Sequence, residues 1–232
     1  MRSLKSPWKD WRRRRLLARA GIVPRDASGT FRAGERSGTW TALRSGLGQG
    51  SVVVSAGVGD NVAWDLAMAA EFGCAVHLLD PTPVASAWIR GVALPTGVTF
   101  HPVALSAHDG TLRLRPPRKE GGVNFRALTG EECAEAIEVP CLRLASFAAQ
   151  LGLDRIDVLK LDIEGGELDV LPDVLASDLG VQQVLVEFHH RPDGRGFDRT
   201  LERIHELQSS GFELFDVSRR GLEMSFARSF PS

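Results

Sequence analysis

Residues 51–83 constrain the fold of this chain most, because they read as one continuous unit, SVVVSAGVGDNVAWDLAMAAEFGCAVHLLDPTP. The β-branched run Val52–Val54 predicts a buried strand, and after a glycine turn the apolar residues recur at helical spacing. A second apolar run, Ala75–Leu79, ends at Asp80. Strand, turn, helix and strand together predict a βαβ unit, and hence a parallel sheet of the α/β class.

The turn and the acid that ends the second strand suit a nucleoside. Gly57 and Gly59 let backbone N–H groups approach a ligand at a helix N-terminus, and a carboxylate about 20 residues further on can accept two hydrogen bonds from a ribose diol. The third glycine of the dinucleotide fingerprint is absent, since Val62 and Ala63 occupy its place. A tight turn without a ligand, and a helix N-cap role for Asp80, are therefore alternatives.

The length of 232 residues and the net charge of −1 fit one ordinary α/β domain and are not typical of a nucleic-acid binder. The charge is unevenly distributed, because residues 1–20 carry eight basic residues against the single acid Asp10. We expect a basic arm and a loop-like lead-in over residues 1–50, followed by one folded domain over residues 51–232.

The basic arm has two alternative interpretations. It can be a solvated or partly helical segment that contacts an anionic surface weakly, since runs of charge are usually solvated. It can also dock on the domain as a helix, because four apolar residues give it a stripe. These are Trp8, Trp11, Leu16 and Leu17.

Nothing in the sequence suggests a membrane span or export. No apolar run approaches the ~18 residues of a span, and the basic start lacks the apolar core of a signal peptide. Cys74, Cys133 and Cys141 form no CxxC pair and are odd in number, which favours reduced thiols. We expect a cytoplasmic protein.

A second informative stretch, residues 156–171, reads IDVLKLDIEGGELDVL. A buried parallel strand ends in Asp162 and Glu164, and two glycines lead into a helix that starts at Glu167. Ligands of open α/β sheets bind at the carboxyl ends of the strands. Acids in the first turn also suit the helix dipole, which explains Glu167 better than Asp162.

A third stretch, residues 184–190, reads VLVEFHH. This apolar strand again ends in ionisable groups, Glu187, His189 and His190. A single histidine at a strand end is most often a satisfied polar group. Acids and histidines at the ends of neighbouring strands are also what a general base or a metal site requires.

The remaining elements follow from periodicity and turn signals. The pattern predicts helices over residues 83–90, 167–175 and 197–209, and strands over residues 98–105, 111–115, 212–217 and 222–226. The sequence His108-Asp109-Gly110 indicates a hairpin, and residues 116–135 resemble a mobile loop over a site or a passive insertion. The last two strands predict an antiparallel pair at the end of an otherwise parallel sheet.

Taken in order, the segments SAGVGDNVAWDLA, FGCAVHLLDPTP, VALSAHDG, IDVLKLDIEGGELDVL and LVEFHH resemble the FkbM family of S-adenosylmethionine-dependent methyltransferases. The resemblance covers roughly residues 38–228. It implies a Rossmann-like class I methyltransferase fold, with a seven-stranded, mostly parallel sheet, an antiparallel last strand and helices on both faces. It also implies methyl transfer from S-adenosylmethionine to a small molecule, typically to a hydroxyl oxygen.

The resemblance also implies which residues contact the cofactor. These are Gly57, Val58, Gly59, Asp60, Asp80, Pro81, Ala104, Leu105, Ser106, Asp162 and Glu164. The glycine turn would lie beside the methionine part of the cofactor, and Asp80 would hold its ribose hydroxyls. Residues 104–106 would lie near the adenine, and residues 162–165 near the methyl group.

Methyl transfer to a hydroxyl requires a proton acceptor. His189 is the first candidate, with Asp162 or Glu187 to orient it. A divalent cation bound by Asp162, Glu187 and His189 is a second way to acidify the hydroxyl, but it is not favoured and no metal ligand is expected. The acceptor depends on loops such as residues 113–135.

Two other function classes share the first βαβ unit. An NAD-dependent oxidoreductase is disfavoured by the missing third glycine and by the absence of tyrosine, the common proton donor of such enzymes. A catalytically silent module that keeps the nucleoside pocket is harder to separate from an enzyme, because only turnover distinguishes the two.

Overall fold

The computed structural model describes residues 7–35, 38–118, 122–128 and 133–230. Seven strands form its main sheet in the order β12-β13-β11-β10-β3-β4-β5. They are β3 (Val52–Ala56), β4 (Ala75–Leu79), β5 (Val98–His101), β10 (Val158–Leu161), β11 (Gln183–Glu187), β12 (Glu213–Val217) and β13 (Glu223–Ala227). β13 is antiparallel to both neighbours, and the other pairings are parallel. The expected antiparallel pair β12–β13 at one end of the sheet is therefore confirmed.

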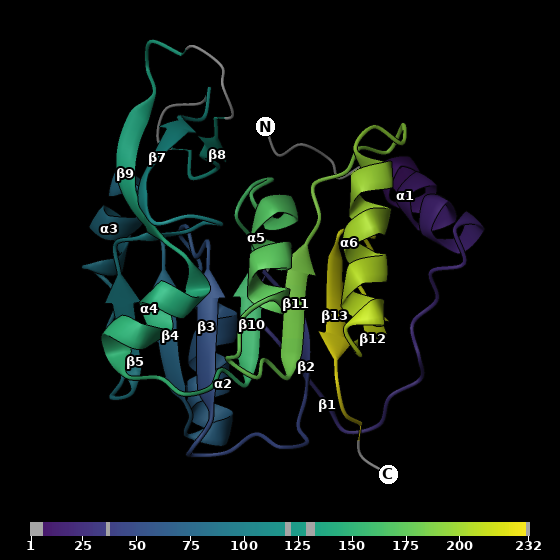
Figure 1. Cartoon of the computed structure of the whole chain (residues 1–232), viewed down its shortest axis with the longest axis horizontal. Coiled ribbons are helices and arrows are strands. Elements are labelled where there is room, and N and C mark those ends of the chain that lie inside the picture. Colours follow the sequence, from purple (N-terminus) through teal and green to yellow (C-terminus); the bar gives the residue numbers. More distant parts are fainter. Residues whose placement is uncertain (1–6, 36–37, 119–121, 129–132, 231–232) are drawn as a thin grey trace.

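Helices cover both faces of this sheet (Figure 1). On one face lie α4 (Leu144–Leu151), α5 (Glu167–Leu175) and α6 (Phe197–Ser209), and on the other α2 (Ala63–Phe72). α3 (Pro83–Ile89) follows β4. Each face has its own apolar core: Phe147 and Ile204 belong to the first, and Trp64 and Met68 to the second. An α/β fold with helices on both faces is thus confirmed.

The predicted loop-like lead-in before residue 51 is only partly loop, because it also contains two strands. Two antiparallel strands, β1 (Thr30–Ala33) and β2 (Trp40–Leu43), form a separate sheet, and β2 contacts β11 and β13. The Gln183 side chain holds β2 in place, since it accepts a hydrogen bond from the Leu43 N–H (2.8 Å) and donates one to the Leu43 carbonyl (3.0 Å). β2 forms because it packs against β11 and β13, which are distant from it in the sequence. Local periodicity does not reveal contacts of this kind.

A small four-stranded sheet rises beyond the carboxyl ends of β3 and β4 (Figure 1). It consists of β6 (Ala104–Leu105), β7 (Gly110–Arg115), β8 (Arg126–Ala127) and β9 (Ile137–Leu142), in the order β6-β9-β7-β8. The single strand predicted over residues 98–105 is therefore two strands in different sheets. The predicted hairpin at His108 is also wrong, because β9 lies between β6 and β7. Of the predicted loop 116–135, residues 119–121 and 129–132 lie outside the described residues.

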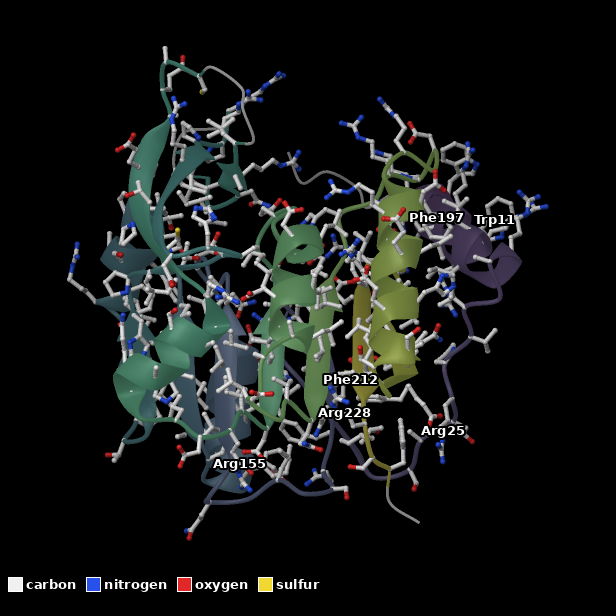
Figure 2. The ribbon with its side chains drawn as sticks, viewed as in Figure 1. Trp11, Arg25, Arg155, Phe197, Phe212 and Arg228 are labelled. Carbon is white, nitrogen blue, oxygen red and sulfur yellow. The ribbon has the colours of Figure 1, made fainter. Side chains whose placement is uncertain are left out.

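The basic arm forms a helix, α1 (Pro7–Arg19), at the side of the molecule where β12 and α6 lie (Figure 1). Leu17 is 3% exposed and belongs to the core cluster of that side, so of the two alternatives the structure has the docked helix. Trp11 is 54% exposed and lies on the outside of α1 (Figure 2). Arg2 and Lys5 lie outside the described residues. Within the described residues, none of the helices has the length and apolar character needed to cross a membrane.

Candidate functional site

A cavity of about 330 Å³ lies at the carboxyl ends of β3, β4 and β10, under the small sheet. Its size is within the usual range for small-ligand sites. The parallel strands meet there because their carboxyl ends share one edge of the sheet. The polar and charged side chains that line it are Asp60, Asn61, Asp65, Asp80, Thr82, Asn124, Lys160, Asp162, Glu164, Glu187 and Arg220.

The glycine turn forms part of the cavity wall, together with Val58 and Asp60. Gly57 has a φ of +81°, and a Cβ at this position would lie 1.8 Å from the carbonyl oxygen of Asp162. Only glycine allows this close approach of β3 and β10. The N–H of Gly59 points across to the next strand end, where it donates a hydrogen bond to Asp80 Oδ2 at 2.9 Å.

Asp80 is 5% exposed and lines the cavity. Its Oδ1 accepts hydrogen bonds from the backbone N–H (2.9 Å) and the hydroxyl (2.6 Å) of Thr82. The N-cap of α3 is Thr82, whose hydroxyl accepts from the Ala85 N–H, so the alternative N-cap role for Asp80 is wrong. The Asp80 carboxylate is thus fixed by Gly59 and Thr82 and forms part of the cavity wall.

The residues expected near an adenine divide into two groups. Ala104 and Leu105 line the cavity, as does Pro81. Ser106 is 7% exposed and is not among the lining residues; its hydroxyl lies 3.2 Å from Nδ1 of His108. The apolar wall is completed by Leu112, Leu114 and Phe125 of the small sheet and its connection.

The ends of β10 and β11 bring three carboxylates to the cavity, those of Asp162, Glu164 and Glu187. Glu164 is the one described non-glycine residue with positive φ, at 52°. Such a backbone is unusual for a residue with a side chain and is typical of functional sites. Two residues of the small sheet and its connection hold the Glu164 carboxylate: Asn124 by a hydrogen bond and Arg126 by an ion pair at 3.7 Å.

His189 lies directly behind these carboxylates and is not itself a lining residue. Its Nδ1 is 2.8 Å from Oε1 of Glu167, which is fully buried, and its Nε2 is 3.4 Å from Glu164 and 4.0 Å from Glu187. Glu167 therefore orients the ring, and the expected orienting role of Asp162 or Glu187 is corrected. In the sequence, the helix dipole is a sufficient explanation for Glu167. Its contact with His189 joins the first turn of α5 to the end of β11, so local sequence does not reveal this contact.

The electrostatics of this cluster are dominated by its carboxylates. Burial by itself lowers the pKa of His189, but the hydrogen bond and charge of Glu167, with the charges of Glu187 and Glu164, raise it to about 9. Burial, with the charges of Asp162 and Glu223, raises the pKa of Glu187 to about 8 against the effect of Arg220. Burial also raises the pKa of Asp162. The cluster thus favours positively charged partners.

Three side chains are placed to hold a divalent cation. One ligand atom each from Asp162, Glu164 and His189 lies within 4.8 Å of the others. Carboxylate and imidazole ligands fit a metal of this kind, and Glu167 fixes the second ring nitrogen as the partners of metal-binding histidines usually do. Glu187, expected in this set, instead forms an ion pair with Arg220 at 2.9 Å.

Several lining residues were missed in the sequence. Lys160 interrupts the apolar strand β10, a signal that was present in VLKL, and it is only 3% exposed. Trp64 and Asp65 lie in the first turn of α2, and Arg220 comes from the turn between β12 and β13. No local pattern marks Arg220, because its place depends on the insertion of β13 between β12 and β11.

The sequence is also similar to known proteins. Residues 44–214 match the family model described as the methyltransferase FkbM domain. A stretch of 103 residues is 34% identical to the AMB antimetabolite synthetase AmbE of Pseudomonas aeruginosa. That match covers 41% of this chain but 5% of the synthetase, so the chain spans a small fraction of that protein's length.

Proposed function

The chain belongs to the FkbM methyltransferase family, and we propose that it transfers a methyl group from S-adenosylmethionine to a hydroxyl of a small molecule. The observation that carries this proposal is the cavity in which the glycine turn and Asp80 stand at one end and a carboxylate cluster at the other. The strand order and the antiparallel β13 support a Rossmann-like class I methyltransferase fold.

The turn and Asp80 suit the nucleoside part of the cofactor. Asp80 is held by the Gly59 and Thr82 N–H groups, so a ribose diol would meet a carboxylate that is already oriented. Ala104, Leu105 and Pro81 provide an apolar wall for a purine. Pre-oriented groups of this kind bind with less loss of conformational freedom.

The carboxylate end of the cavity suits the transfer step. S-adenosylmethionine would supply a methyl carbon on a positively charged sulfonium; the new O–C bond forms as the S–C bond breaks, and the hydroxyl proton must go to a base. The carboxyl groups of Asp162 and Glu164 line this part of the cavity. His189, held by Glu167, would take the proton in its neutral form. Because its pKa is raised to about 9, this is the minor form at pH 7, and the rate should increase with pH up to about 9. Positioning would contribute most of the rate enhancement.

A cation-assisted version is a second possibility, supported by the convergence of Asp162, Glu164 and His189. A divalent cation there would acidify the acceptor hydroxyl. These residues would then be ligands, and Glu167 would orient His189 as before.

The proposal is tested by a methyl-transfer screen that measures S-adenosylhomocysteine formation against hydroxylated sugars, polyketides and other small molecules. Each active acceptor is then assayed with and without chelator. Turnover insensitive to chelator supports the base mechanism, and loss restored by Mg²⁺ or Mn²⁺ supports the cation. Calorimetric binding of S-adenosylmethionine with no turnover on any acceptor would favour the silent module. Binding of NAD alone would favour an oxidoreductase.

The proposal also covers the domain division, the N-terminal arm and the cellular location of the protein. We divide the chain into an arm and lead-in over residues 1–50 and a methyltransferase domain over residues 51–232. The exposed arginines and Trp11 of α1 support a weak contact with an anionic surface, which co-sedimentation with phosphatidylserine vesicles at low and high salt would test. The free cysteines support a cytoplasmic location.

A further inference from the structure

Lys160 is a buried ammonium group without a direct ion pair. It is 3% exposed, and its Nζ lies 3.2 Å from the Ser55 hydroxyl and 5.2 Å from the centre of the Trp40 ring. None of the ion pairs in the described part of the chain includes it. A buried charge is costly unless it is paired, so this lysine has unused capacity to bind an anion in the cavity that it lines.

Asp65 is a buried carboxylate on the same cavity, opposite in charge to Lys160. It is 1% exposed, and its Oδ1 has no hydrogen-bond partner among the described residues. The neighbouring Trp64 is also 1% exposed, and its Nε1, a donor, is unpartnered as well. Both residues line the cavity. Buried polar atoms are nearly always hydrogen-bonded, so these atoms indicate a ligand.

The side chains of Lys160, Trp64 and Asp65 differ in hydrogen-bonding role and in charge. Lys160 and Trp64 offer donors, and Asp65 offers an acceptor with negative charge. The ammonium and the carboxylate do not form an ion pair with each other, although both line one cavity. A ligand that carries a carboxylate and an ammonium close together would satisfy all three side chains. The head of an α-amino acid is such a group.

We propose that Lys160 and Trp64 bind the carboxylate, and Asp65 the ammonium, of the methionine end of S-adenosylmethionine. This inference rests on the proposed function. The cofactor is favoured over a separate amino acid because the glycine turn and Asp80, which suit its nucleoside, line the same cavity. The three side chains would thus select the complete cofactor over shorter adenosyl compounds.

Calorimetry with two ligands tests this assignment. S-adenosylhomocysteine carries the amino-acid head, and 5′-methylthioadenosine has the same nucleoside without it. Lys160→Met and Asp65→Asn should each weaken S-adenosylhomocysteine binding about ten- to a hundredfold, as loss of a hydrogen bond to a charged group does. Binding of 5′-methylthioadenosine should not change.

Matched charge changes elsewhere provide the controls. Arg155→Met removes a positive charge at the opposite edge of the sheet, near the amino end of β10 (Figure 2). Asp198→Asn removes an exposed carboxylate from the first turn of α6. Neither should alter the affinity of either ligand. Lys160→Met should remain folded and be at least as resistant to urea as the wild type, since it removes a buried charge that lacks a direct ion pair.

The outcomes separate this inference from the proposed function. Equal weakening of both ligands, or of neither, in the Lys160 and Asp65 variants would overturn the amino-acid assignment while leaving a methyltransferase. Failure of the wild type to bind either adenosyl ligand would overturn the proposed function. In that case, L-methionine binding that the two variants lose would support a site for a free amino acid, and its absence would overturn the inference as well.

Discussion

Glu167 fixes His189 through a single carboxylate oxygen: Oε1 lies 2.8 Å from Nδ1 and accepts the backbone N–H of His189 at 3.2 Å. Its other oxygen accepts the N–H of Gly165 at 2.8 Å. One buried carboxylate thus connects the loop after β10 with the end of β11. This relationship gives the proposed base a defined orientation, with Nε2 directed at the carboxylates of the cavity.

His189→Ala should therefore retain cofactor affinity and lose roughly 10² to 10⁴ in rate, the usual contribution of a positioned base. Single-turnover assays, corrected for the folded fraction, measure this loss. His190→Ala is the control: His190 is buried against Phe197, and neither ring nitrogen has a partner in the described structure. Full activity of His189→Ala would remove the catalytic assignment.

Glu167→Gln should reduce the rate through His189 rather than through the cofactor. The amide nitrogen would face the Gly165 N–H or the imidazole, so one donor loses its acceptor at a cost of about 1 to 3 kcal/mol in the free energy of unfolding. We expect an unchanged dissociation constant for S-adenosylhomocysteine and a lower kcat. Equal kcat values for the variant and the wild type would show that orientation of the ring is not needed.

Asp80→Ala should weaken S-adenosylmethionine binding by about 1.5 to 3 kcal/mol, because it removes the charged acceptor expected to hold the ribose. Asp80→Asn separates this role from the structural one. It retains an acceptor for Thr82, which already uses Oδ1, and loses the negative charge toward the cavity, although its amide nitrogen no longer accepts the Gly59 N–H. Calorimetry with a folded variant is the measurement, and unchanged affinity would rule out the ribose assignment.

Gly57→Ala tests the close approach of β3 and β10. The new Cβ would meet the Asp162 carbonyl, whereas a Cβ at Gly46, with a similar φ of +78°, meets nothing within 4 Å. Gly46→Ala should cost about 1 to 2 kcal/mol for its left-handed backbone alone. Gly57→Ala should cost about 1 to 3 kcal/mol more for the overlap. Urea unfolding of both variants measures the difference, and equal costs would contradict the reported approach.

Local signals were sufficient for some elements and not for others. The predicted helices over residues 167–175 and 197–209 have the observed bounds of α5 and α6, since glycines precede both and the apolar periodicity is strong. The pairing of β6 with β9 was not predictable, because its partner lies more than 30 residues away and no turn connects them. Pairings of this kind depend on tertiary packing.

The same distinction applies to the site. Asp80, Asp162, Glu164 and Glu187 were predictable, because strand ends in a parallel sheet share one edge. The partner of His189 was not, since several acids follow β10 and sequence does not say which one turns inward. Lys160 was readable as a charge inside an apolar strand.

Acidification should destabilise the fold through a pair of half-buried histidines on neighbouring strands. His77 Nδ1 lies 3.1 Å from His101 Nε2, and both rings meet Phe147 edge to face. Burial lowers the pKa of His77, and burial together with the charge of His77 lowers that of His101. The pair is therefore neutral in the folded protein at pH 7, with one ring donating to the other.

The sign of the effect follows from proton binding. Below the unfolded pKa of about 6.5, the unfolded chain holds more protons at these positions than the folded protein does. The contribution is therefore fully present above about pH 6.5 and is lost as the pH falls through the lowered folded pKa values. Urea unfolding between pH 7.5 and 5 should show decreasing stability. His77→Phe should reduce this slope whatever its stability at pH 7, while His205→Phe, on α6 in a position that is exposed, should not. An unchanged slope in His77→Phe would show that other groups cause the acid sensitivity.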